Sequence, residues 1–113
     1  MKKIFVTMAL EDYLIPGEEI KYQSGESLVK YGGKDYKLIL TNKRILLYNS
    51  RGLVVKKDDV VTQKLDELQG VKYKEKGLIS KEGLIEIQGK TLIQLSGHAA
   101  SMKALYQQIM QFI

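Results

Sequence analysis

The sequence predicts a mainly β domain that is closed by one C-terminal helix. Apolar and polar residues alternate in short runs between residues 19 and 95, glycines separate these runs, and after residue 97 the apolar spacing becomes helical. The chain has 113 residues, which is the length of one domain. We therefore expect about seven antiparallel strands, arranged as a bent barrel or two orthogonal sheets, capped by the helix.

The first strands are expected on either side of short turns. A Pro-Gly turn at residues 16–17 leads into residues 19–31, which predict one long or bent strand. Residues 32–35 predict a hairpin turn. In the run LILTNKRILLY (residues 38–48), we expect Asn42 and Lys43 at the tip of a tight hairpin, because asparagine tolerates positive φ.

The rest of the β region is divided by glycines and charged residues. Turns are predicted at residues 50–52 and 89–90, and the charged segments 76–77 and 81–83 bracket the apolar pair Leu78 and Ile79. The remaining strands are expected over residues 44–49, 53–55, 60–62, 65–68, 71–73, 84–87 and 91–95.

The end of the chain has the pattern of an amphipathic helix over residues 99–112. Ser96 is a candidate N-cap. The apolar stripe must be buried, and the open end of the β structure is the nearest apolar surface. The stripe has +3, +4 and +3 spacing and consists of Met102, Leu105, Ile109 and Phe112.

Composition and charge favour a folded, basic, cysteine-free domain. The residues are 44% apolar and 27% charged, which argues against disorder, and the formal net charge is +5. The absence of cysteine suits the cytoplasm, with the inner membrane face as a peripheral location. The apolar run 4–10 is short for a signal peptide and has no cleavage pattern, so we expect it to pack on the domain or on another subunit.

Two motifs resemble those of a known family. The segment LIPGEEI (residues 14–20), followed about twenty residues later by LTNKRILLY (residues 40–48), resembles the prokaryotic pleckstrin-homology-like domains, with GRAM-type domains as the second choice. The resemblance covers residues 14–113 and leaves residues 1–13 as an N-terminal extension. It implies a seven-stranded bent barrel with a closing helix, a binding function without catalysis, and, for some members, ring-forming homo-oligomers.

Basic residues are candidates for contact with an anionic ligand or membrane. In phosphoinositide-binding relatives, basic residues gather in the loop after the first strand; here that loop has lysines, no arginine and Asp35, which departs from the pattern. The alternative is a solvated face whose lysines discourage edge pairing. The candidate residues are Lys30, Lys34, Lys37, Lys43, Arg44, Arg51, Lys56 and Lys57.

Arg44 has a second interpretation. Simple alternation places it on the same face as Leu46 and Tyr48, where a guanidinium needs a carboxylate or backbone carbonyl partner. We therefore favour a structural role, in which Arg44 ties the hairpin to a neighbouring segment.

The sequence has no residues to which we can assign catalysis. His98 is the only histidine and no cysteine is present, so we expect no metal site and no cofactor. No serine lies in a G-x-S-x-G context, and the glycines lack the spacing of a phosphate-binding loop. Adjacent carboxylates on a strand point to opposite faces and do not converge on an ion.

We therefore expect a binding or assembly module. Protein contact, including self-contact, ranks ahead of weak contact with an anionic membrane, and a monomer in which these segments cover the core is the alternative to self-association. A small basic β-barrel that binds nucleic acid is the rival function, with Tyr31, Tyr36 and Tyr48 as stacking platforms. The self-association candidates are Ile4, Phe5, Val6, Phe112 and Ile113.

Overall fold

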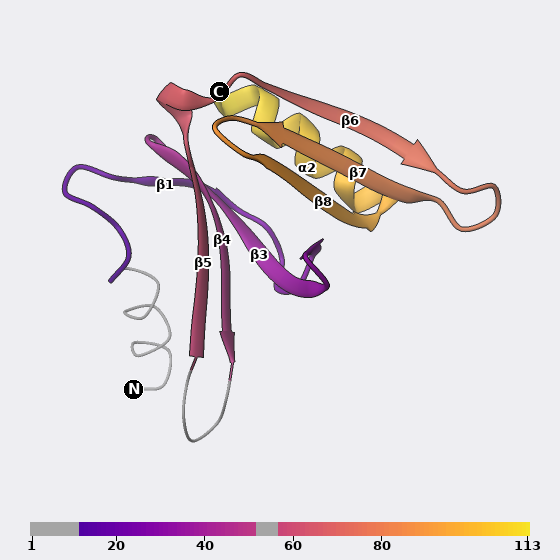
Figure 1. Cartoon of the computed structure of the whole chain (residues 1–113), viewed down its shortest axis with the longest axis horizontal. Helices are drawn as coiled ribbons and strands as arrows, with labels where there is room; N and C mark the ends of the chain where they lie inside the picture. The colour runs from indigo at the N-terminus through magenta and orange to yellow at the C-terminus, as the bar shows by residue number, and fades with distance from the viewer. Residues whose placement is uncertain (1–11, 52–56) are drawn as a thin grey trace.

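The computed structural model describes residues 12–51 and 57–113, which form antiparallel strands and one C-terminal helix (Figure 1). The fold class expected from the sequence is confirmed: the protein is mainly β, with a helix packed on the strands. The elements are β1 (Ile20–Gln23), β2 (Val29–Tyr31), β3 (Lys34–Thr41), β4 (Arg44–Arg51), β5 (Lys57–Lys64), the 3-10 turn η1 (Leu65–Glu67), β6 (Gly70–Lys76), β7 (Glu82–Gln88), β8 (Leu92–His98) and α2 (Ala99–Phe112).

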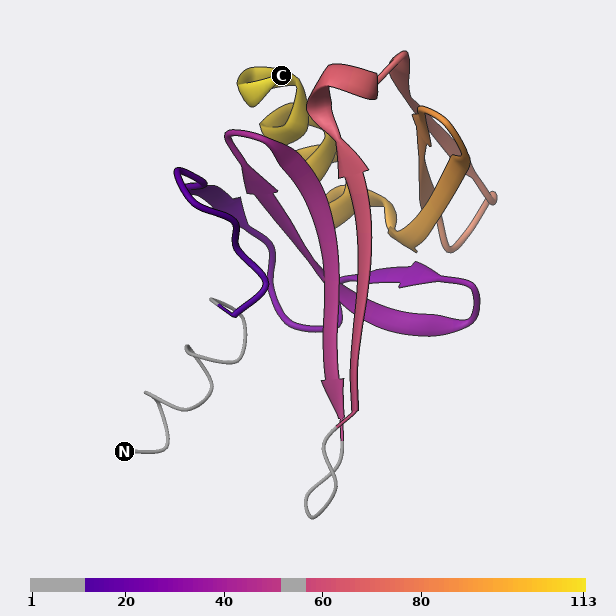
Figure 2. The ribbon, with the colours of Figure 1, turned by 60° about the vertical axis from the view of Figure 1, so that its left-hand side comes forward.

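The strands form two layers that share β2. Their order is β5-β4-β3-β2-β8-β7-β6, with β1 also paired to β3. Because β2 pairs with both β3 and β8, it joins the β3–β4–β5 layer to the β6–β7–β8 layer. Figures 1 and 2 show the two layers crossing steeply, with α2 beside β6, β7 and β8.

Strands β3 and β4 are buried on both faces, which explains the two continuous apolar runs on either side of their turn, residues 38–40 and 45–48. The inner face contributes residues such as Leu38 and Leu47 to the main core, together with β7, β8 and α2. The outer face carries a second cluster made by Ile39, Leu46 and Tyr48, which is covered by side chains that are partly buried: Leu14, Ile20 and Val60. Continuous apolar runs are typical of strands that are covered on both sides.

Helix α2 approaches β7 and β8 closely because these strands have glycines beneath it. Met102, Leu105 and Ile109 are fully buried, as the sequence predicted. A Cβ at Gly83 would lie 2.6 Å from the Cβ of Met102, and one at Gly97 would lie 2.8 Å from its sulfur. The helix can therefore pack this closely on β7 and β8 only because these two positions have no side chain.

The C-terminal residue of the predicted stripe does not belong to the core. Phe112 is 40% exposed, at the last residue of the helix. Tyr73 contacts the N-terminus of the helix: its hydroxyl donates to Glu75 Oε2 at 2.7 Å and lies 3.1 Å from the carbonyl oxygen of Ala99. Burial, together with the hydrogen bond and charge of Glu75, raises the pKa of Tyr73 to about 12.

The strand expected over residues 19–31 is broken. Between β1 and β2, the Ser24 N–H donates to the Leu38 carbonyl (2.8 Å), the Ser24 hydroxyl accepts from the Leu38 N–H (2.9 Å), and Ser27 has a φ of 54°. The following turn is shorter than expected. Gly32 and Gly33 alone form it, both with positive φ, while residues 34 and 35 already belong to β3.

Three other predicted boundaries are wrong. Residues 50 and 51 continue β4 and are not a turn. Residues 65–67 form η1 and not a strand, because the Leu65 N–H donates to the Lys43 carbonyl and the Leu68 N–H donates back to Leu65. Ser96 is not an N-cap, since it pairs with Leu84 within β8. The predicted strand 53–55 and the N-terminal run 4–10 lie outside the described residues.

We predict that Gly83→Ala destabilises the protein by about 1–3 kcal/mol, because the added methyl group forces α2 away from β7. Chemical denaturation followed by circular dichroism measures this change. The matched control is Gly25→Ala, where the new Cβ meets nothing within 4 Å and the free energy of unfolding should change by less than about 0.5 kcal/mol. Equal stability of the two variants would contradict the proposed close packing.

Candidate functional site

The turn between β3 and β4 is organised by the hydroxyl of Thr41. This oxygen accepts hydrogen bonds from the N–H groups of Lys43 (3.1 Å) and Arg44 (3.0 Å). Asn42 does not use the positive φ that the sequence suggested, because Ser27 is the only non-glycine residue with positive φ among those described. The turn therefore closes through side-chain hydrogen bonds.

The polar groups of Asn42 form hydrogen bonds that hold the preceding segment. Its side-chain oxygen accepts from the Glu19 N–H (2.7 Å), its side-chain nitrogen donates to the Gly17 carbonyl (3.1 Å), and its own N–H donates to the Glu19 carbonyl (3.0 Å). The segment of residues 12–19, here called the lead-in, is thereby fixed to the hairpin.

A buried ion pair completes this connection. The Glu18 side chain is fully buried, and its Oε2 atom accepts from Arg44 Nε (2.8 Å) and from the Thr41 hydroxyl (2.6 Å). Its Oε1 atom accepts from Arg44 Nη2 (2.9 Å) and from the Ile15 N–H (3.0 Å). Arg44 Nη2 also donates to the carbonyl oxygen of Tyr13. Arg44 therefore has the carboxylate and carbonyl partners that its position requires.

These hydrogen bonds decide the charge state of Glu18. Burial alone would raise the pKa of this carboxyl group. The hydrogen bonds from Arg44, Thr41 and the Ile15 N–H, together with the charge of Arg44, outweigh burial and lower the pKa to about 2. Glu18 is thus ionised at neutral pH and forms a neutral pair with Arg44.

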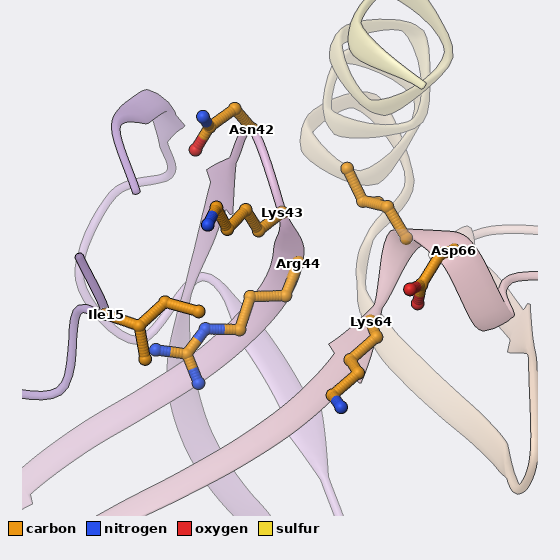
Figure 3. A pocket seen from close by; sticks show the side chains of 7 residues that line it. Ile15, Asn42, Lys43, Arg44, Lys64 and Asp66 are labelled. Atoms are coloured by element: carbon orange, nitrogen blue, oxygen red, sulfur yellow. The ribbon is translucent and has the colours of Figure 1, made fainter. Parts of the chain in front are cut away.

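A hollow of about 610 Å³ lies between the β3–β4 turn and the end of β5 (Figure 3). Ile15 and Leu65 supply its apolar walls. Because Arg44 is neutralised by Glu18, the remaining charges of Lys43, Lys64 and Asp66 give the lining a net charge of only +1. The described lining residues are Ile15, Asn42, Lys43, Arg44, Lys64, Leu65 and Asp66.

The side chains around the hollow are hydrogen-bond donors and acceptors and include no catalytic pair. Lys43 Nζ lies 3.2 Å from the Pro16 carbonyl oxygen, so part of its donor capacity already holds the lead-in. The described lining residues provide ammonium, amide and carboxylate groups, but no serine, cysteine or histidine. This arrangement suits weak contact with an anionic group and supplies no nucleophile–base pair.

The structure divides the predicted basic residues into two groups. Lys30, Lys34 and Lys37 lie around the β2–β3 hairpin, whereas Lys43 and Arg44 lie beyond the opposite end of β3, about 25 Å away along the strand. Lys34 pairs with Asp59 (3.4 Å) and Lys37 with Glu26 (3.5 Å), so the first group is partly neutralised.

The remaining basic candidates lie near the other end of β4. Arg51 and Lys57 are opposite each other where β4 and β5 meet their connection, while Lys56 lies outside the described residues. Backbone pairing therefore places this pair near the Lys34 end of β3. The seven candidates within the described residues do not share one rim.

Two of the three tyrosines proposed as stacking platforms are unsuitable. Tyr36 is 5% exposed and belongs to the main core, and Tyr48 is 9% exposed and belongs to the outer cluster. Tyr31 is half-buried, with its ring edge-on to Tyr36 at 6.0 Å. Bases cannot stack on buried rings, so this expectation is wrong for Tyr36 and Tyr48.

The histidine and the C-terminal candidates are at the surface. His98 is exposed at the end of β8, where it is the N-cap of α2 without a side-chain cap bond. Within the described ranges, no group of three histidine or carboxylate side chains could hold a metal ion. Phe112 and Ile113 are 40% and 47% exposed, while Ile4, Phe5 and Val6 lie outside the described residues.

The sequence interpretation gave no role to the most exposed apolar residues of the described chain. Leu78 and Ile79 are 99% and 100% exposed, at the tip of the β6–β7 hairpin. The sequence contained a signal for this site, because two adjacent aliphatic residues are unusual between charged turn segments. Glu18 was also missed as a site residue, since its partner Arg44 is 26 positions away in the sequence.

Comparisons with known proteins found no matching family model, curated protein or solved structure. Among residues 12–51 and 57–113, no helix combines the length and apolar character needed to cross a bilayer.

We predict that Glu18 makes the protein's stability depend on acid pH. A carboxyl group with a pKa lowered from 4.5 to about 2 stabilises the folded state above pH 4.5. It should contribute about 3 kcal/mol, which is lost as the pH falls from about 5 to about 2. In Glu18→Gln this part of the pH dependence should disappear, and stability at pH 7 should fall, because the partly buried Arg44 loses its carboxylate partner.

Denaturation curves between pH 2 and pH 7 measure both effects. Glu19→Gln is the matched control, because the Glu19 side chain is 72% exposed. The stability of this variant should depend on pH in the same way as that of the wild type. An unchanged acid profile in Glu18→Gln would show that the ion pair does not carry this stability.

Proposed function

We propose that this chain is a non-enzymatic assembly module with a prokaryotic pleckstrin-homology-like fold, which binds a second copy of itself. The fold assignment is supported by the antiparallel sheet, in which seven strands follow one order and β1 pairs with β3 beside it, and by the helix packed on the strands. The two motifs that carry the resemblance, LIPGEEI and LTNKRILLY, also contact each other through Glu18 and Arg44. GRAM-type domains are the second choice for the same reasons.

The observation that carries the self-association proposal is an apolar corner at the end of α2. Phe112 and Ile113 are exposed by 40% and 47%, beside Leu65 and Leu68 on the segment that joins β5 to β6. Together they surround a hollow of about 400 Å³. We call these four residues the C-terminal corner. Its exposed side chains would gain free energy by burial against a partner.

The edges of the sheet are weaker candidates for self-contact. Strands β5 and β6 are at the two ends of the strand order. Strand β6 carries Lys74 and Lys76, which are 59% and 66% exposed, and lysines on an edge strand oppose pairing with another sheet. The C-terminal corner therefore has the better combination of apolar character and accessibility.

The other functions have less support. The basic residues near the β2–β3 hairpin are partly paired with carboxylates, which reduces their attraction to an anionic membrane. The positive net charge still favours nucleic-acid binding, but two of the three tyrosines proposed for base stacking are buried. We propose a cytoplasmic location and assign no enzymatic activity, because the hollows of about 610 and 400 Å³ are lined by no serine, cysteine or histidine.

We predict that the wild-type chain self-associates and that Phe112→Ser/Ile113→Ser raises the dissociation constant about tenfold to a hundredfold. The expected factor follows from the loss of two partly exposed apolar side chains from the interface. Multi-angle light scattering over a concentration series should give a mass above 12.9 kDa for the wild type. The double variant should approach the monomer mass at the same concentrations.

Leu78→Ser is the control for this measurement, because Leu78 is fully exposed but lies at the other end of β6. It should associate like the wild type. A wild-type chain that is monomeric at every concentration, or a corner variant that associates normally, would contradict the proposal.

A further inference from the structure

The connection between β6 and β7, residues 77–81, is the second unexplained apolar feature of the surface. Leu78 and Ile79 are almost completely exposed, whereas the other large exposed apolar residues of the described chain are between 36% and 51% exposed. Figure 1 shows this connection projecting beyond the ends of β8 and α2. We call residues 77–81 the hairpin tip.

The backbone of the hairpin tip holds the two side chains outward. Gly77 has a φ of +103°, and a Cβ there would lie 2.5 Å from the carbonyl oxygen of Ser80. Only glycine permits this turn without strain. On the other side, the Lys81 carbonyl accepts a hydrogen bond from the Ala99 N–H at 3.3 Å. The tip is therefore tied to the first residue of α2.

Lysines surround the hairpin tip. Lys72, Lys74 and Lys76 alternate along β6 and are all exposed, and Lys81 follows the apolar pair. Four lysines and two glutamates give residues 72–82 a net charge of +2. Lys76 is 3.5 Å from Glu82, but both side chains remain exposed, so this lysine can exchange its partner for another anion.

This combination suits a lipid surface better than a protein partner. A stable protein–protein interface buries at least about 1,200 Å², which a convex tip with two apolar side chains cannot provide alone. A bilayer needs no complementary pocket: aliphatic side chains enter the boundary between headgroups and acyl chains, and lysines remain at the level of the phosphates.

We propose that the hairpin tip inserts Leu78 and Ile79 into the interfacial region of an anionic lipid bilayer, while Lys76 and Lys81 contact the lipid phosphates. This inference does not depend on self-association, since it uses different residues. It also assigns membrane contact to a part of the chain other than the basic residues of the β2–β3 hairpin.

Vesicle sedimentation tests the proposal. The wild-type chain should bind vesicles of phosphatidylcholine and phosphatidylglycerol (7:3) and should bind pure phosphatidylcholine vesicles much more weakly. Leu78→Ser/Ile79→Ser should weaken binding to the anionic vesicles by about a hundredfold or more. Lys76→Gln/Lys81→Gln should weaken it by about tenfold or more and reduce its dependence on salt.

Leu92→Ser is the matched control, because Leu92 is 51% exposed at the opposite end of the β7–β8 pair. It should bind vesicles like the wild type. All variants should retain the wild-type melting temperature, since the substituted side chains make few contacts in the fold. If the wild type binds no vesicles, binds both compositions equally, or binds as well without Leu78 and Ile79, the proposal is overturned.

A fluorescence measurement locates the contact directly. The chain contains no tryptophan, so Leu78→Trp introduces a single reporter at the hairpin tip. Its emission should shift to shorter wavelength with anionic vesicles and should be quenched by brominated lipids. Leu92→Trp should show neither effect. Quenching at position 92 but not at position 78 would place the membrane contact elsewhere and overturn the proposal.

Discussion

The arrangement of the whole domain depends on the burial of one face of α2 against β7 and β8. Met102 rests where Gly83 and Gly97 leave space, and Leu105 and Ile109 fill the core between the two layers. Because the apolar face of α2 covers the core, the features that remain for binding are on the outside. The C-terminal corner lies at the end of α2, and the hairpin tip is tied to the first residue of the helix.

The buried pair of Glu18 and Arg44 plays a corresponding role on the outer face. It holds the lead-in against β3 and β4, so that both faces of these strands are covered. A buried ion pair adds little net stability compared with apolar packing, but breaking it leaves an uncompensated charge. The contact between the two recognised motifs is therefore best understood as a device that fixes one position of the lead-in. The positive charge that Arg44 would bring to the adjacent hollow is therefore neutralised by Glu18.

The sequence pattern predicted those elements whose structure depends on interactions between residues that are close in the sequence. The alternation of residues 84–87 and the helical spacing of Met102, Leu105 and Ile109 each follow from burial on one side of an element, and both are confirmed. The errors have non-local causes. The turn η1 is set by a hydrogen bond from Leu65 to Lys43, and the break near Ser24 by hydrogen bonds to Leu38. The carboxylate partner of Arg44 was expected from chemistry, but its identity depends on how distant segments pack.

The two proposed contacts are compatible because β6 separates them. The C-terminal corner adjoins Gly70 at the start of this strand, and the hairpin tip follows Lys76 at its end. Seven residues of strand span about 23 Å, so a second copy bound at the corner would leave the tip accessible. A dimer would carry two tips, and a dimer whose symmetry directs both to the same side would place them on one surface. Since the second insertion in such a dimer is intramolecular, weak contacts by individual tips would combine into a much stronger attachment. Self-association would in this way control membrane contact without any change in the tip itself.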